Sequence, residues 1–312
     1  MVHYLKNGEI NKQKWDECIR NSFNGIVYAY SWYLDIVCEG WDGLVEDNYT
    51  AVMPLTKGRK FMLDYLYQPY FTQQSGVFSN KILSEEIVNE FLNSIPSKYK
   101  LIEINLNLFN KTSIDSFNRI ERVTYQLDLI NSYDNIYKSF STNNKRNIKK
   151  AEAAGLKICR NSTPEEVIEL FRRNASNIKG LEVNNKVYAV LKKLIYALIL
   201  HGHAHIWTTL TSNDVLCGGA FFVQSNNKII FLFSATDNFG KENGAMSFLI
   251  SSFIKENSMR NLVLDFEGSN IENLARFYSG FGAKKCTYLH LQRYDFPYCF
   301  KKIKDKIGKI LH

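Results

Sequence analysis

Two acidic residues, Asp265 and Glu267, are the strongest candidates for catalysis in this 312-residue sequence. They lie at the end of the apolar run 262–265, which we interpret as a strand. Residues two apart in a strand share a face, and ligands of α/β proteins bind at the carboxyl ends of strands. One carboxylate can accept a proton while the other positions an amine. The structural alternative is that Glu267 caps a helix beginning at Asn270 and that Asp265 binds backbone groups or Arg276.

Tyr278 is the third candidate for a catalytic role. A tyrosine hydroxyl can act as a general acid. Tyr278 also shares a helix face with Ile271, Leu274 and Ala275, which is the pattern of a tyrosine in a hydrophobic core.

Basic residues form a second set of candidates. The net charge of the chain is +8, and residues 138–160 contain seven basic residues and one acidic residue. A further basic run, 301–309, contains five lysines and one aspartate. Such concentrated charge attracts phosphate backbones or anionic membranes, although a solvated helix face has the same composition. At i,i+4 spacing, one wide helical face carries Lys145, Arg146, Lys149 and Lys150.

The start of the predicted helix 240–256, at Lys241 and Gly244, is a second possible site for binding the phosphate groups of a substrate. Exposed amides at a helix start can bind phosphate. Met246, however, stands where a small residue would be needed, and its side chain crowds a close approach of phosphate. The presence of Met246 therefore argues against binding of acetyl-CoA, whose pyrophosphate would need this site.

The acceptor cleft is predicted from polar and aromatic residues on both halves of the chain. Tyr70, Gln73 and Gln74 stand in an aromatic segment around Pro69, which suits either a cleft wall or the edge of a β-rich core. Ser269, Asn270 and Arg276, which follow Glu267, complete the predicted cleft.

Several other classes of protein have little support in the sequence. His201, His203 and His205 alternate as metal ligands can, but a helix running into a strand explains them better, and no metal site is predicted. The six cysteines form no CxxC pair. P-loop, Rossmann and GxSxG fingerprints do not occur. With neither a membrane-spanning run nor a signal peptide, we expect a cytoplasmic protein without a tightly bound cofactor.

The order of predicted elements gives a mixed α/β fold in two lobes. We expect a first lobe at 1–135, a second lobe at 136–298 that opens with the basic helix, and an amphipathic helix at 299–312 that packs on the first lobe. In the first lobe, 26–28 is predicted as a strand. The second lobe runs strand, two helices, three-strand meander, helix, strand, helix, strand, which is the order of the GNAT acyltransferase fold.

Two segments resemble signatures of the Fem-type peptidyltransferases. They are 142–155, which contains the basic face, and 264–283, which contains the acidic pair and Tyr278. The resemblance covers most of the chain and implies two tandem GNAT-like lobes. It also implies transfer of an amino acid from aminoacyl-tRNA to an amine of a peptidoglycan precursor peptide. The chain lacks the inserted coiled-coil arm of some members. The spacing from Tyr278 to Gly282 is similar to that of acetyl-CoA-dependent GNAT enzymes, in which the tyrosine protonates the leaving thiolate.

Three functions follow from these patterns. The first is an acyltransferase that uses aminoacyl-tRNA and a peptide or amino-sugar amine. The second is an N-acyltransferase that uses acyl-CoA or an acyl carrier protein. The third is a catalytically inactive double lobe that binds RNA or an anionic membrane surface. The sequence identifies neither the acceptor nor the oligomeric state.

Overall fold

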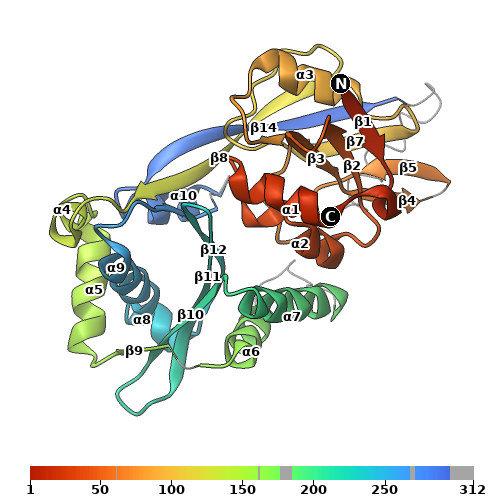
Figure 1. Cartoon of the computed structure of the whole chain (residues 1–312). Coiled ribbons are helices and arrows are strands. Elements are labelled where there is room, and N and C mark those ends of the chain that lie inside the picture. The colour runs from red at the N-terminus through yellow and green to blue at the C-terminus, as the bar shows by residue number, and fades with distance from the viewer. Residues whose placement is uncertain (61, 161, 176–184, 268–270, 296–312) are drawn as a thin grey trace. The chain divides into compact units, whose positions relative to one another are not determined.

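The computed structural model describes residues 1–60, 62–160, 162–175, 185–267 and 271–295 (Figure 1). The chain divides into two units, Met1–Arg122 with Thr287–His312 and Val123–Cys286. The predicted division near residues 135 and 298 differs from this one, because the chain passes between the units within two long strands. The predicted helix at 299–312 lies outside the described residues. Within those residues, no helix is long and apolar enough to cross a membrane.

The first unit contains an antiparallel sheet in the order β1-β2-β3-β6 and a second set of strands in the order β4-β5-β7-β14. β14 joins β7 through the pairs from His290 to Tyr294. The strands are β1 Val2–Leu5, β2 Asp42–Glu46, β3 Ala51–Leu55, β4 Lys57–Lys60, β5 Leu63–Leu66, β6 Phe78–Ser79, β7 Tyr99–Asn105 and β14 Lys284–Tyr294.

Helices complete the first unit and bury its apolar side chains. Phe91 and Leu92 of one helix pack with Ile102 and Leu291 of two neighbouring strands. The segment 26–28 was wrongly predicted as a strand. It is short, apolar and buried, a pattern that suits a strand and a helical turn equally. The helices are α1 Lys12–Asn21, α2 Ser31–Val37 and α3 Glu85–Asn93, with 3-10 turns at Asn7–Glu9 and Val27–Ala29.

The second unit is built on a mixed sheet in the order β8-β13-β12-β11-β10-β9. β12 and β13 are parallel, and the other neighbours are antiparallel. The strands are β8 Asn118–Asp128, β9 Lys157–Cys159, β10 Ala204–Leu210, β11 Leu216–Ser225, β12 Lys228–Thr236 and β13 Val263–Asp265. The helices are α4 Tyr133–Lys138, α5 Thr142–Ala153, α6 Pro164–Ala175, α7 Asn185–Leu200, α8 Asn238–Glu242, α9 Ala245–Asn257 and α10 Glu272–Ser279.

Helices cover both faces of this sheet (Figure 1). On one face, Phe253 of α9 stacks on Phe222 with 3.6 Å between ring centroids. On the other face, Phe171 of α6 packs against Phe233 at 4.6 Å. Strand alternation therefore supplies apolar side chains to two hydrophobic layers. The predicted mixed α/β fold is confirmed. The element order predicted for the second lobe is also observed, except that the helix after the meander is divided in two and the last strand, β14, belongs mainly to the first unit.

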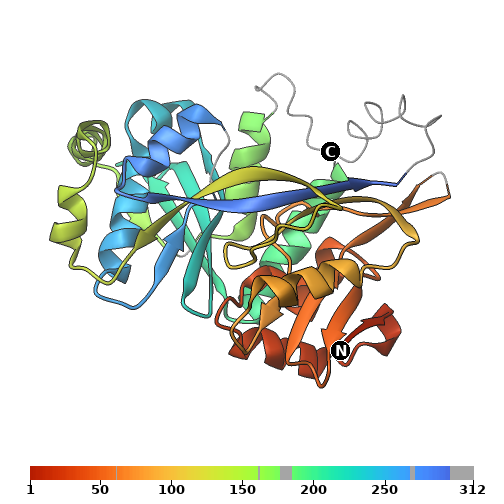
Figure 2. The same ribbon diagram turned by 90° about the horizontal axis from the view of Figure 1, so that it is seen from above.

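Local sequence explains where the helices begin and end. Thr163, just before α6, donates from its backbone amide and its hydroxyl to Glu166, at 2.6 and 3.0 Å. The hydrogen bond from the Thr163 amide to a glutamate three residues later, and Pro164 in the first turn, are typical of a helix start. The helix predicted at 240–256 is instead divided into α8 and α9, because Gly244 adopts a φ of +72°. The second view shows β8 and β14 as two long strands that lie side by side (Figure 2).

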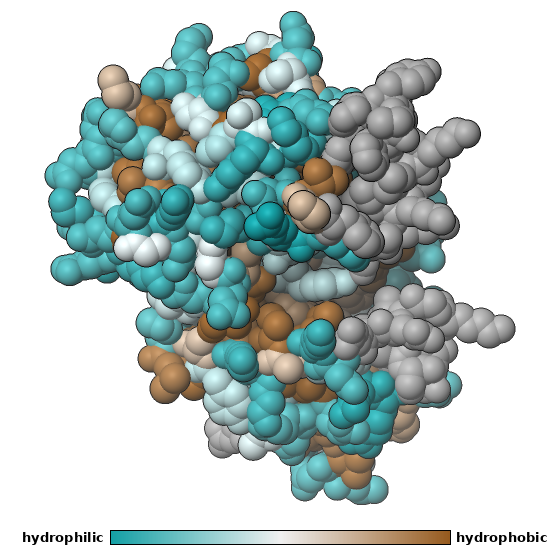
Figure 3. All heavy atoms as spheres, turned by 90° about the vertical axis from the view of Figure 1, so that its right-hand side faces the viewer, coloured by the Kyte–Doolittle hydropathy of each residue, from teal (hydrophilic) through white to brown (hydrophobic). Residues whose placement is uncertain are grey.

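The two cores bury many of the large apolar side chains. The surface seen in Figure 3 is mainly hydrophilic, with smaller hydrophobic groups between the polar residues.

Candidate active site

The carboxyl end of β13 is where the second unit exposes an unpaired strand edge. β12 and β13 are paired only from Lys228 with Val263 to Ile230 with Asp265. β12 continues to Thr236, and within the described residues no strand pairs with this part of its edge. The register between β11 and β12 shifts where Phe222 pairs with Phe231, so that β12 carries a bulge next to the opening. Bulges often lie beside active sites, and α/β proteins bind ligands at such strand ends.

Asp265 ends β13 and is almost completely buried, with 1% of its surface exposed. Its carboxylate accepts hydrogen bonds from the Thr124 hydroxyl at 2.5 Å and from the Gln126 amide at 2.8 Å. Lys228 lies 3.5 Å away and forms an ion pair with it. Both oxygens are therefore occupied by partners on neighbouring strands. This arrangement holds the carboxylate in place and does not leave it open to a substrate.

Glu267 has the opposite environment. Its backbone amide donates to Asp265 Oδ1 at 3.0 Å, and its φ is +50°, which is uncommon for a non-glycine residue. The residue as a whole is half-buried, but Oε1 is buried and has no hydrogen-bond partner among the described residues. Burial alone raises the pKa of this carboxyl well above its ordinary value. A buried polar atom without a partner, held by a strained backbone, is a mark of a functional residue.

Tyr278 of α10 stands beside this carboxyl in an aromatic environment. Its ring stacks on Phe266 with 5.1 Å between centroids and meets Phe231 edge-on at 6.1 Å. Burial, and secondly the charge of Glu267, raises the pKa of the Tyr278 hydroxyl to about 12. The hydroxyl therefore stays protonated at neutral pH and can serve as a hydrogen-bond or proton donor. The apolar rings lower the local dielectric, which strengthens electrostatic interactions there.

The structure thus brings the three predicted catalytic residues together but gives them different environments. Asp265 faces partners on β8 and β12, whereas Glu267 lies near Tyr278, because the left-handed backbone at Glu267 interrupts the strand alternation. One structural alternative for the acidic pair is observed, because Asp265 binds a backbone group, the Glu267 amide. The other two are not seen among the described residues: Arg276 forms an exposed pair with Glu272 at 2.9 Å, and α10 has no side-chain cap there.

Several residues of this site had no signal in the sequence. Thr124, Gln126, Lys228 and Phe231 come from strands distant in the chain from Asp265. Only the strand register places them around the acidic pair. Thr124 and Gln126 alternate on β8, a weak sign of a shared face that did not indicate what they would contact.

The two segments that resemble Fem-type signatures pack on one another. Asn144 of α5 donates to the Phe277 carbonyl of α10 at 3.3 Å, and the Ser141 amide donates to the Gly280 carbonyl at 2.8 Å. At Gly280, a Cβ would lie 2.8 Å from the Ser141 hydroxyl. Both signatures therefore contribute to the packing that supports Tyr278.

The predicted donor residues lie on α5 and around the start of α9. Lys145 donates to the Lys138 carbonyl at 3.0 Å and Arg146 to Asn143 at 2.7 Å, while Lys149 and Lys150 are exposed. The buried residues Ile148 and Ala151 occupy the opposite side of α5. The basic face is therefore open to solvent.

Gly244, at the start of α9, is buried against α5. A Cβ on it would lie 2.4 Å from the Asn147 carbonyl oxygen. Met246 packs against the hydrophobic core. Lys241 is exposed on α8. The start of α9 is thus covered by α5, and Gly244 presents no open side to a phosphate.

The predicted acceptor residues lie on both units or outside the described residues. In the first unit, Tyr70 is 52% exposed, whereas Gln74 is buried and accepts from the Leu108 amide at 3.2 Å. Gln74 also donates to Gln73 at 3.0 Å. The Gln74 side chain therefore stabilises the loop in which it stands. Ser269 and Asn270 lie outside the described residues, and Arg276 is exposed on α10.

The three histidines lie where a helix leads into a strand, as predicted. α7 ends at Leu200 and β10 begins at Ala204. His203 contacts the Gln224 carbonyl at 2.7 Å. Within the described residues, no group of acidic, cysteine or histidine side chains is arranged to hold a metal.

Comparison with solved structures places this chain among proteins of known fold. It is similar to FemX, with a TM-score of 0.63 and 14% identity over 92% of this chain and 96% of that one. L-PGS from Bacillus licheniformis gives 0.55 and 10% over 96% of each chain. The C-terminal domain of a putative lysylphosphatidylglycerol synthetase from Agrobacterium fabrum gives 0.57 and 7% over 90% and 91%. No protein-family model and no curated protein matches the chain. The resemblance to Fem-type proteins is confirmed at the level of the fold.

Proposed function

We propose that this chain is an aminoacyltransferase that moves an aminoacyl group from aminoacyl-tRNA to an amine of a peptide or amino sugar. The observation that carries the proposal is the buried carboxyl of Glu267, whose Oε1 has no hydrogen-bond partner within the described part of the chain. This carboxyl lies beside Tyr278 and stands where β12 and β13 separate. The name of one structural neighbour, lysylphosphatidylglycerol synthetase, denotes an enzyme that makes an aminoacylated product.

Glu267 suits the role of the group that accepts the proton of the amine. Its pKa is raised because its charged form is buried without a compensating charge. An incoming ammonium supplies that charge and favours the carboxylate, which then takes the proton. The neutral amine attacks the ester carbonyl carbon, and a tetrahedral oxyanion forms. No covalent enzyme nucleophile is needed.

Tyr278 suits the role of the group that returns the proton to the leaving oxygen. When the tetrahedral species collapses, the ester C–O bond breaks and the leaving alkoxide takes the Tyr278 proton. The protonated Glu267 then restores the proton to Tyr278. The ammonium loses two protons in all. The one that Glu267 takes ends, through Tyr278, on the tRNA hydroxyl, and the second leaves the nitrogen of the tetrahedral species for solvent before that species collapses. Both side chains then return to their initial states.

Two observations support a tRNA donor over an acyl-CoA donor. The basic face of α5 is exposed and continuous, which suits the repeated phosphates of a nucleic acid. The start of α9, a helix terminus that would otherwise suit a pyrophosphate, is covered by α5 at Gly244. Transfer from an acyl-CoA is the alternative result that the test below can give.

The test measures transfer from total radiolabelled aminoacyl-tRNA, and separately from radiolabelled acetyl-CoA, to a lysine-containing tetrapeptide and to glucosamine. We expect product from aminoacyl-tRNA only. We also expect the Tyr278→Phe variant to react about 10² to 10⁴ times more slowly, the range for a proton-transfer residue. Asn273→Ala, at an exposed residue of the same helix, serves as the control. Product from acetyl-CoA alone contradicts the proposed donor.

A further inference from the structure

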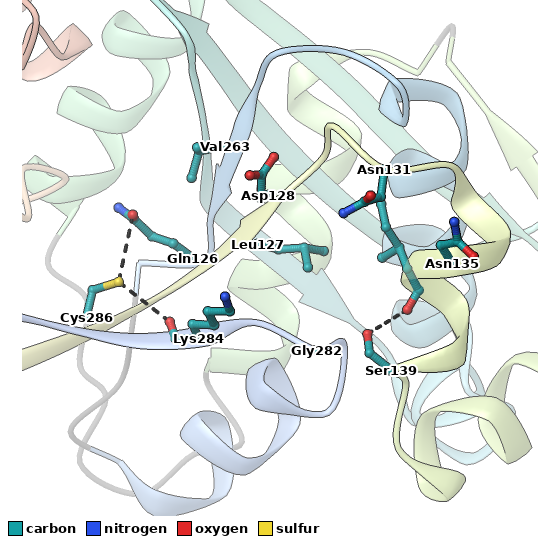
Figure 4. Close-up of a pocket in the computed structure, with 11 residues that line it drawn as sticks. Gln126, Leu127, Asp128, Asn131, Asn135, Ser139, Val263, Gly282, Lys284 and Cys286 are labelled. Carbon is teal, nitrogen blue, oxygen red and sulfur yellow. Dashed lines mark hydrogen bonds between the residues drawn. The ribbon is translucent and has the colours of Figure 1, made fainter.

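A pocket of about 450 Å³ lies within the second unit, between the end of β8, the start of β14 and α4 (Figure 4). Its volume is in the range of small-molecule sites. None of its residues belongs to the predicted catalytic, donor or acceptor sets. The polar residues that line it are Gln126, Asp128, Asn131, Asn135, Ser139 and Lys284.

Several polar groups of this pocket remain available to a ligand. Asp128 uses Oδ1 to accept from the Ile130 amide, at 2.9 Å, and Asn135 uses Oδ1 to accept from Lys138, at 3.0 Å. Within the part of the chain that the structure describes, the Asn131 side chain and the Lys284 ammonium have no hydrogen-bond partner. The pocket therefore offers amide donors, an amide acceptor, a carboxylate oxygen and an ammonium.

This set of groups indicates the class of the ligand. Asp128 and Lys284 balance one another, so the pocket has no excess of positive charge to favour a phosphate group. Each asparagine side chain carries a donor and an acceptor, the same pair that a peptide group presents. The side chains thus match a neutral chain of amide groups better than an anion.

Hydrogen bonds connect the pocket to the proposed reaction centre. Gln126 lines the pocket and donates to Asp265, its direct partner across the β8–β13 ladder, at 2.8 Å. Asp265 in turn accepts from the Glu267 amide at 3.0 Å. Asp265 thus links a pocket residue and the backbone of the proposed catalytic residue through hydrogen bonds.

We propose that this pocket binds a short peptide segment of the acceptor, on the side away from the amine that reacts. The proposal rests on the proposed transfer reaction at Glu267 for the identity of the peptide as acceptor. Binding itself does not depend on the reaction and can be measured without it.

Cys286 provides a local probe, since its thiol lines the pocket and lies 3.9 Å from Gln126. The experiment follows alkylation of Cys286 in the full chain by iodoacetamide at about pH 9, with and without tetra-alanine, by peptide mass spectrometry. Cys159, half-buried at the far edge of the same sheet, reports any general change in reactivity. Equilibrium dialysis with radiolabelled tetra-alanine measures binding independently of the thiol.

We expect tetra-alanine at ten times its Kd to slow alkylation of Cys286 about tenfold and to leave Cys159 unchanged, by simple mass action. The double variant Asn131→Ala, Asn135→Ala should lose this protection. Asn213→Ala, at an exposed asparagine in the β10–β11 turn, should keep it.

Two results overturn the proposal. One is the absence of both protection and binding in dialysis at millimolar tetra-alanine; the other is protection by glucosamine but not by the peptide. The Glu267→Gln variant should retain protection. If it retains protection and wild-type transfer is not detected in any assay, the pocket stands while the proposed reaction fails.

Discussion

The contact between α5 and the start of α9 can be tested by adding a single methyl group at Gly244. Gly244 has a φ of +72°, and a Cβ there would lie 2.4 Å from the Asn147 carbonyl oxygen and 2.9 Å from its carbon. Gly202 is a matched control, since its φ is +70° and a Cβ there would meet nothing within 4 Å. Both glycines belong to the second unit, so the two alanine variants differ chiefly in the steric contact.

The expected costs follow from these two geometries. A left-handed backbone costs a non-glycine residue roughly 1–2 kcal/mol, which is the whole expected loss in unfolding free energy for Gly202→Ala. Overpacking adds about 1–3 kcal/mol, so Gly244→Ala should lose about 2–5 kcal/mol. Urea unfolding measures both losses as shifts of the midpoint at unchanged slope. Equal losses in the two variants, within about 0.5 kcal/mol, would refute the close packing of α5 on α9 and with it the argument against an acyl-CoA donor.

Three further predictions concern the charged groups. Replacing the four basic residues of α5 with glutamine should flatten the dependence of tRNA binding on salt, from a log–log slope of roughly −3 to −4 toward zero; an unchanged slope in a binding titration across a salt series places the tRNA site elsewhere. Glu267→Gln should remove a pH-dependent part of stability. The folded pKa of Glu267 is raised, so its contribution is fully present below the unfolded pKa and is lost as pH rises through the folded pKa. Urea midpoints from pH 4 to 9 should therefore fall less steeply in this variant than in the wild type, and parallel curves contradict the raised pKa. Asp265→Asn should destabilise the chain by about 3 to 5 kcal/mol, because it leaves Lys228 without its buried partner, and a loss below about 1 kcal/mol in urea unfolding contradicts the ion pair.

The sequence was sufficient to predict features that depend on local patterns. The apolar run of β12, the proline-initiated α6 and the asparagine turns of the meander follow from strand periodicity and turn chemistry, and they fix the order of the second unit. Asp265, Glu267 and Tyr278 could be chosen as candidates because each stands at or near the end of an element with a clear pattern.

Features that depend on register or on single backbone angles could not be predicted in this way. Whether Asp265 is open to substrate depends on Gln126, which lies opposite it only in the folded sheet. The orientation of Glu267 depends on one positive φ, which no residue type at that position signals. The division of helix 240–256 depends on the fit of Gly244 under α5. The sequence shows a glycine there, but not the neighbour that requires it.

The most direct test of the central claim compares Glu267→Gln with Glu272→Gln in single-turnover transfer from aminoacyl-tRNA. Glu272 is an exposed carboxylate on α10, and its side chain is 87% exposed, so the pair separates the buried carboxyl from a nearby surface charge. If Glu267 accepts the proton of the amine, its replacement lowers the rate about 10² to 10⁴-fold, and the loss is smaller at high pH, where the amine arrives unprotonated. Glu272→Gln should react within about twofold of the wild type. A Glu267→Gln variant that transfers as fast as Glu272→Gln at every pH contradicts the assignment of this site.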